Sequence, residues 1–160
     1  MNHQAAPNSI YQGGYFLIEF AVVIALTLGV LVISFKGMAS YQKYLARLQL
    51  KAAVNVVASD LIYLQQKSLF DGDISFYSMD TASSGYSIRK AGKTSIKKLE
   101  FSQIGCKDVY FTQYALSIAF SSNGRPKGNH YLELSHKRLT DVYYRIDIEP
   151  VTGRVVVHER

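Results

Sequence analysis

The feature that most constrains this chain is a long apolar segment near its N-terminus. Residues 15–35 read YFLIEFAVVIALTLGVLVISF, and Glu19 is the only charged residue among them. About 21 residues at about 1.5 Å each extend about 31 Å as a helix, enough to cross a hydrocarbon core. A buried helix of a soluble protein is the alternative, but such helices are rarely apolar on every face over this length. We therefore expect a membrane-inserted helix.

The segment does not have the pattern of an ordinary cleaved secretory signal. Such signals begin with Lys or Arg and are cut at a small-residue site after the apolar stretch. Here residues 1–14 contain neither Lys nor Arg, and the small residues Gly13 and Gly14 precede the stretch. No Ala-x-Ala sequence follows Phe35. The ordinary signal-peptide interpretation is therefore disfavoured.

Glu19 is costly in such a segment and requires a partner. A charged side chain at mid-membrane costs roughly 2.5–3.5 kcal/mol or more, and such residues usually pair with another group. Glu19 lies five residues after Gly14. Cleavage after Gly14 would give Tyr15 a new α-amino group, which can pair with the carboxylate within one subunit or between neighbours. The alternative is a Glu19 that snorkels to the membrane interface.

The sequence Gly14-Tyr15-Phe16-Leu17-Ile18-Glu19, followed by an apolar stretch, resembles the processing signal of type IV prepilins and type II secretion pseudopilins. The resemblance implies that a prepilin peptidase/methyltransferase removes residues 1–14, cleaving after Gly14, and methylates Tyr15. It also implies that Glu19 sets subunit registration. The chain differs from the usual pattern in having Tyr15 and Phe16 where the family prefers Phe and then Thr or Ser.

Residues 37–70 predict an amphipathic helix that continues the apolar one, residues 15–36, into the globular part. Apolar side chains recur at three-to-four spacing, which is typical of a helix with one buried face. A helix lying on a membrane surface is the alternative. The residues that we expect to face the domain core are Tyr41, Tyr44, Leu45, Leu48, Ala52, Val56 and Ile62.

Residues 71–160 predict a β domain. Asp71-Gly72-Asp73 is a turn sequence that ends the helix, and the apolar period then shortens to two. Hairpin-type separators and the absence of a second helical segment favour antiparallel pairing. The fold class is therefore α+β, a long helix packed on antiparallel sheet. The predicted strands are 74–79, 86–89, 96–101, 109–111, 115–121, 130–135, 142–148 and 151–158.

This region resembles one subgroup of the same family, the minor pseudopilins of type II secretion and the FimT-like minor pilins. The shared features are a strand followed by Asn123-Gly124-Arg125-Pro126 and a terminal hairpin containing Gly153-Arg154-Val155. Major pilins commonly close a C-terminal loop with a disulfide, which the single Cys106 cannot form. The resemblance therefore implies a minor subunit with other pilin or pseudopilin subunits and an inner-membrane assembly platform as partners. It implies a single-pass protein of the bacterial inner membrane, with an extracytoplasmic β domain.

We expect no enzymatic activity, cofactor or metal site. The chain contains no HExxH, CxxC, GxSxG or P-loop motif, and the acidic residues after Asp71 lack the spacing of a calcium loop. A plain signal-anchored extracytoplasmic protein remains an alternative to the filament subunit.

DNA binding is a second alternative, because the net charge is +6. Basic side chains can contact phosphates without regard to sequence, although a solvated basic face gives the same composition. FimT-like pilins of DNA-uptake systems carry a Gly-Arg-x-Arg stretch, and here Val156 stands at the second Arg position. The candidate DNA contacts are Arg89, Lys90, Lys97, Lys98, Arg125, Lys127, Arg154 and Arg160.

Overall fold

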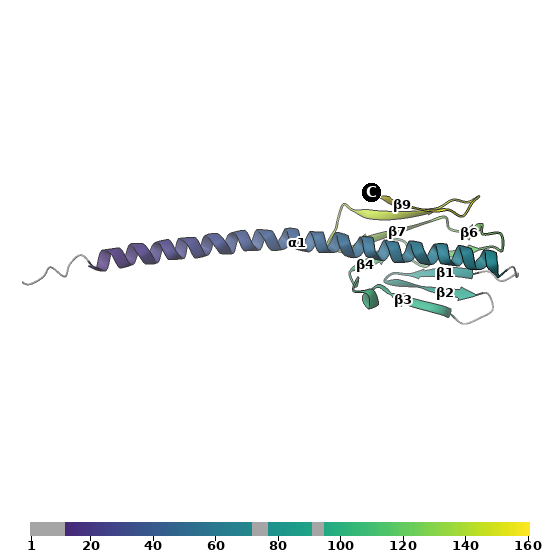
Figure 1. Ribbon diagram of the computed structural model, residues 1–160, viewed down its shortest axis with the longest axis horizontal. Coiled ribbons are helices and arrows are strands. Elements are labelled where there is room, and N and C mark those ends of the chain that lie inside the picture. Colours follow the sequence, from purple (N-terminus) through teal and green to yellow (C-terminus); the bar gives the residue numbers. More distant parts are fainter. Residues whose placement is uncertain (1–11, 72–76, 91–94) are drawn as a thin grey trace, which may run out of the picture. The chain divides into compact units, whose positions relative to one another are not determined.

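The computed structural model describes residues 12–71, 77–90 and 95–160 (Figure 1). The chain divides into two units, residues 1–42 and 43–160. One helix, α1 (Gln12–Phe70), contributes to both units. Most of the predicted leader, residues 1–14, lies outside the described residues, as do Asp73 and the start of the first predicted strand.

In the first unit, α1 is exposed from Tyr15 to Phe35 and is long and apolar enough to cross a membrane. The two aliphatic hydroxyl side chains of this segment, Thr27 and Ser34, donate hydrogen bonds to carbonyls of the helix itself. Thr27 Oγ1 donates to the carbonyl of Ile24 at 2.8 Å, and Ser34 Oγ donates to the carbonyl of Val30 at 2.8 Å. Because a hydroxyl without a partner is costly in hydrocarbon, these bonds make the segment more compatible with lipid.

The second unit contains the remainder of α1 and two antiparallel sheets. The five-stranded sheet has the order β3-β2-β1-β5-β6, and the four-stranded sheet has the order β4-β7-β8-β9. The α+β class predicted from the sequence is confirmed. The strands are β1 (Tyr77–Ala82), β2 (Gly85–Lys90), β3 (Ser95–Glu100), β4 (Val109–Phe111), β5 (Ser117–Phe120), β6 (Pro126–Gly128), β7 (Tyr131–His136), β8 (Tyr143–Ile148) and β9 (Val155–Glu159).

The core lies between α1 and the two sheets. It includes Phe101 from a 3-10 helix, η1 (Phe101–Ile104), Phe111 from β4 and Phe120 from β5, all fully buried. The rings of Phe101 and Phe111 are 5.3 Å apart in a tilted arrangement that favours aromatic contact. The helix side chains in this core are Ala46, Leu50, Ala53, Val54, Val57, Ala58, Leu61 and Leu64.

The predicted core-facing stripe of the helix is therefore wrong. Tyr44, Leu48 and Ile62 are exposed, and the buried residues lie about half a turn away around the helix. Both faces carry apolar side chains, so periodicity alone does not select one. The buried face includes alanines at positions 46, 53 and 58, whose small side chains allow the sheets to approach the helix backbone.

Several strand boundaries also differ from the prediction. β6 was not predicted, because Pro126 and Gly128 have the composition of a turn. The last strand begins at Val155 rather than at 151, since residues 150–152 form a turn and Gly153 has φ +71°. Phe101 begins η1 instead of ending β3. The chain also crosses between sheets, because β4 pairs with β7 whereas β5 pairs with β1.

Candidate functional site

The Gly14–Tyr15 peptide bond lies in the first turn of α1, and Glu19 lies one turn further along the same helix. Tyr15 and Glu19 are both exposed. Within the described part of the chain, no hydrogen bond or ion pair involves the Glu19 carboxylate, and residues 15–35 supply no cation. This acid therefore has no intrachain partner among the described residues.

A second feature of α1 is an apolar face that the two sheets leave exposed. We call it the outer apolar face and define it as Tyr44, Leu45, Leu48, Ala52 and Ile62. At 100° per residue these positions lie on one side of the helix, opposite Leu50, Val57 and Leu61 of the core. The apolar positions from Tyr44 to Ala52 are grouped together, whereas the exposed Asn55 and Ser59 separate them from Ile62. Exposed apolar patches on a folded unit are typical of interaction sites. The sequence analysis identified these side chains but assigned them to the core.

Four of the candidate DNA contacts are engaged with acidic side chains. Arg89 Nε lies 2.7 Å from Asp80, and Lys97 Nζ lies 2.6 Å from Asp60. The remaining two pairs are Lys90–Asp71 at 3.4 Å and Lys98–Glu100 at 3.2 Å. The predicted basic cluster around the β2–β3 hairpin is therefore largely neutralised by its own neighbours.

Two other candidates, Arg125 and Arg154, lie on turns that touch each other. Gln65 Nε2 of α1 donates to the carbonyl of Gly124 at 3.3 Å and to the carbonyl of Thr152 at 2.9 Å. Both arginines are exposed. Lys127 lies in β6, two residues after Arg125. Arg160 forms backbone hydrogen bonds with Tyr143, at the opposite end of the β8–β9 hairpin. The structure thus brings Arg125 and Arg154 into one region and leaves Arg160 apart.

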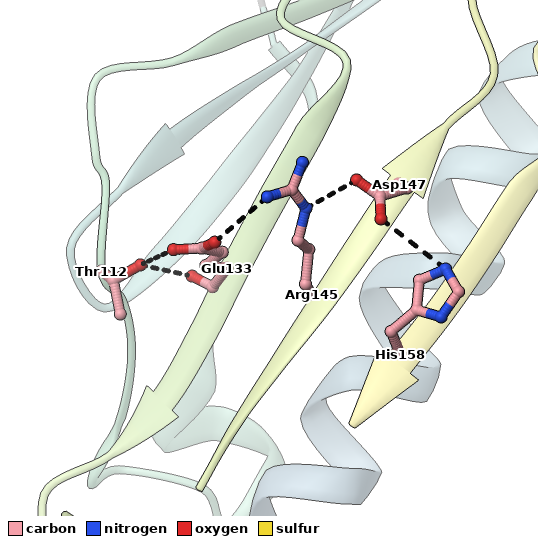
Figure 2. Close-up of polar contacts among 5 residues, drawn as sticks. All are labelled: Thr112, Glu133, Arg145, Asp147 and His158. Carbon is pink, nitrogen blue, oxygen red and sulfur yellow. Dashed lines mark hydrogen bonds and ion pairs between the residues drawn. The ribbon is translucent and has the colours of Figure 1, made fainter. Parts of the chain in front are cut away.

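Arg145 is also unavailable as a free cation, because it lies in a polar network on the four-stranded sheet (Figure 2). Its Nε is 2.7 Å from Asp147, its Nη1 is 3.8 Å from Glu133, and its guanidinium lies 4.2 Å from the centre of the Tyr131 ring. Asp147 in turn contacts His158 at 3.6 Å. The Asp147 carboxylate raises the pKa of the guanidinium.

The described residues contain no group of three His, Cys, Asp or Glu side chains able to hold a metal ion. Cys106 is free and buried, and burial raises the pKa of its thiol. A buried thiol with a raised pKa is a poor nucleophile.

A further polar cluster, which no sequence motif indicated, joins α1 to the loop between η1 and β4 and to strand β7. The Cys106 thiol donates a hydrogen bond to the backbone carbonyl of Gln49 at 3.3 Å. The side-chain Nε2 of Gln49 donates to the backbone carbonyl of Gly105 at 3.1 Å. The third contact of Gln49 is with His136, a buried residue of β7. Because these contacts span 56 to 87 residues of sequence, no local signal indicates them.

No family model, curated protein or solved structure matches this chain.

Proposed function

We propose that this chain is a minor pilin or pseudopilin, a structural subunit of a type IV filament system. In this proposal the subunit inserts in the bacterial inner membrane with its β domain outside. A prepilin peptidase cleaves after Gly14 and the new N-terminus at Tyr15 is methylated. Assembly machinery then transfers the subunit into a helical bundle of pilin or pseudopilin subunits, in type II secretion or in a type IV pilus.

The observation that carries the proposal is Glu19, a carboxylate on an apolar helix with no partner in the described part of its own chain. Cleavage after Gly14 would place an α-amino group one helical turn away. Stacked subunits would then pair each acid with the N-terminus of the same or a neighbouring chain. Pairing within one chain requires cleavage, and pairing with a neighbour requires both cleavage and assembly; either pairing would offset the cost of the isolated charge.

The outer apolar face supports the same proposal. A helix bundle needs apolar side chains on the side of the helix that the globular domain does not cover, and residues 44–62 of α1 provide them. A simple membrane anchor has no requirement for a second apolar face on its extracytoplasmic helix.

The first experiment is the intact mass of the native membrane protein. We expect loss of residues 1–14 and gain of one methyl group. A chain that retains Met1 supports the plain signal-anchored alternative and contradicts the proposal. Gly14→Val provides the control, because it should block cleavage while the chain still inserts in the membrane.

The second experiment concerns registration. Glu19→Val should insert normally but be lost from sheared filaments or from the isolated secretion apparatus. Thr27→Val is the matched control, since it also replaces a polar side chain in the apolar segment, and we expect it to assemble normally. Equal incorporation of both variants would contradict the role of Glu19.

DNA binding is retained as a second candidate function because the exposed Arg125 and Arg154 lie on neighbouring turns that Gln65 joins. In this case the full chain in phosphatidylcholine nanodiscs should bind duplex DNA with an affinity that falls as salt rises. Arg125→Ala with Arg154→Ala should weaken binding, whereas Arg89→Ala should not, because Arg89 is held by Asp80. Unchanged binding by the double variant would exclude this site.

A further inference from the structure

The second unit contains a half-open groove of about 490 Å³ between one flank of α1 and the strands β1 to β3. Asp60, Tyr63 and Lys67 line it from the helix, where spacings of three and four residues place them on one flank. Ile88 of β2 and Ile96 of β3 line it from the sheet. The volume lies within the range of small-molecule sites.

The groove has an apolar interior. Ile88 is almost fully buried at 2% exposure, whereas Tyr63 and Ile96 are 52% and 58% exposed. Two large apolar side chains that are half-exposed therefore border the same cavity. An aromatic or aliphatic group inserted between them would remove apolar surface from water, at about 25 cal/mol per Å².

The more exposed charged groups at the groove are cationic. Lys67 contacts Asp71 at 3.2 Å and Lys97 contacts Asp60 at 2.6 Å, and the side chains of both lysines are 42% exposed. The carboxylates are less exposed, at 24% for Asp71 and 15% for Asp60. They are also occupied, because Asp60 accepts from the Tyr86 hydroxyl and Asp71 from the Tyr77 hydroxyl.

The charge balance also favours an anion. Among the described residues in and beside the groove, Lys67 and Lys90 pair with Asp71 and Lys97 pairs with Asp60, so three cations are opposed by two anions. An ammonium group has three N–H donors. The ion pair of Lys67 with Asp71 and that of Lys97 with Asp60 each involve a single carboxylate and leave a donor available. Each lysine can therefore donate a further charge-assisted bond to a ligand.

We propose that this groove binds a small molecule with an aromatic or aliphatic body and a single anionic group. The body lies between Tyr63 and Ile96 over Ile88, and the anion accepts hydrogen bonds from Lys67 or Lys97. This site is separate from Glu19 and from the outer apolar face, so it does not depend on filament assembly.

The test uses the full chain in phosphatidylcholine nanodiscs, labelled at the isoleucine δ1-methyl groups and observed by NMR. The probes are 2-naphthoate, the uncharged 2-naphthamide and the cationic 2-naphthylmethylammonium. We expect 2-naphthoate to shift the Ile88 and Ile96 methyl signals saturably and to leave Ile146, which is buried in the four-stranded sheet, unchanged. We expect the anion to bind roughly tenfold more tightly than the cation, from one charge-assisted hydrogen bond.

Two variants locate the site. Lys67→Met and Lys97→Met together should remove the preference for the anion, with exposed Lys107→Met as the matched control. Ile96→Trp should fill the cavity and abolish the shift at Ile88. The proposal is overturned if no saturable shift occurs, if the cation binds equally well, or if 2-naphthoate shifts only methyl groups of residues 15–35 through partition into lipid.

Discussion

The imidazole Nε2 of His136 lies 3.1 Å from Gln49 Oε1, so a single hydrogen bond connects strand β7 to helix α1. His136 Nδ1 accepts a hydrogen bond from the backbone N–H of Arg138 at 3.1 Å. Since Nδ1 is an acceptor, the proton of the neutral ring is on Nε2 and is donated to Gln49. This arrangement holds the histidine neutral in the folded protein.

We expect the stability of the folded unit to fall as pH decreases below about 6.5. Burial lowers the pKa of His136, and the nearby Arg138 charge lowers it further, whereas the Asp108 carboxylate raises it but does not outweigh burial. The unfolded state therefore binds more protons between the lowered pKa and about 6.5, and stability is lost over that interval. Urea unfolding of the full chain in micelles, followed by near-UV circular dichroism from pH 8 to 5, measures this.

The matched variants are His136→Gln and His130→Gln. The first should remove most of the pH dependence, whereas the second replaces an exposed histidine and should retain it. A wild-type profile that stays flat between pH 7 and 5 would contradict the role of His136.

The end of α1 provides a second pH-dependent contribution, at lower pH. The Tyr77 hydroxyl and the Lys67 ammonium lower the pKa of Asp71 to about 2. Because the folded pKa is lower than the unfolded value of 3.8, the stabilisation is present above about pH 4 and is lost as pH falls to 2. Asp71→Asn should be less stable than wild type at pH 7, with the difference shrinking in that interval. Asp141→Asn, at an exposed position, should show no such change.

Gly153 is a position where a side chain is not tolerated. Its φ is +71°, and a Cβ there would overlap the Gly124 carbonyl oxygen and the Gln65 amide. Gly105 has a similar φ of +76°, but a Cβ added there would meet no atom within 4 Å. Gly105→Ala should therefore cost about 1 kcal/mol for the left-handed backbone alone, and Gly153→Ala about 2 kcal/mol more. Urea unfolding of the two variants measures the difference, and equal losses would show that the contact of the two turns contributes nothing.

The two faces of α1 should respond differently to the same truncation. Leu50 is fully buried, and Leu50→Ala should lower the free energy of unfolding by about 3 kcal/mol. Leu48 is 46% exposed on the outer apolar face, so Leu48→Ala should lower the free energy of unfolding by less than about 1 kcal/mol. Denaturant midpoints of the two variants at one pH provide the comparison. Similar losses would mean that the outer face is covered within the subunit.

The fold class and the extent of α1 were predictable because they depend on local signals. A continuous apolar and then amphipathic pattern predicted the helix, and Asp71 marked its end at Phe70. The buried face was not predictable, since Leu48 and Leu50 are equally apolar and only the sheets distinguish them. The crossing of the chain between sheets at β4 likewise depends on pairing with the distant β7.

The candidate site shows the same limit. The signal at Gly14, Tyr15 and Glu19 is contiguous in sequence and was therefore readable, although cleavage and registration remain predictions. The basic residues were identified individually, but their acidic partners were not. Lys97 meets Asp60 across 37 residues of sequence, and composition contains no information about that pairing.

Because α1 carries apolar side chains on both its buried and its exposed face, correct folding of this protein does not by itself ensure solubility. When residues 43–160 are fully folded, the outer apolar face is still exposed to solvent. Better packing of the core does not reduce this exposure. Fragments lacking the first unit will therefore adhere to one another or to detergent even when perfectly folded. Polar replacements at Leu45 and Leu48, rather than stabilising changes in the interior, are the means of keeping such fragments dispersed.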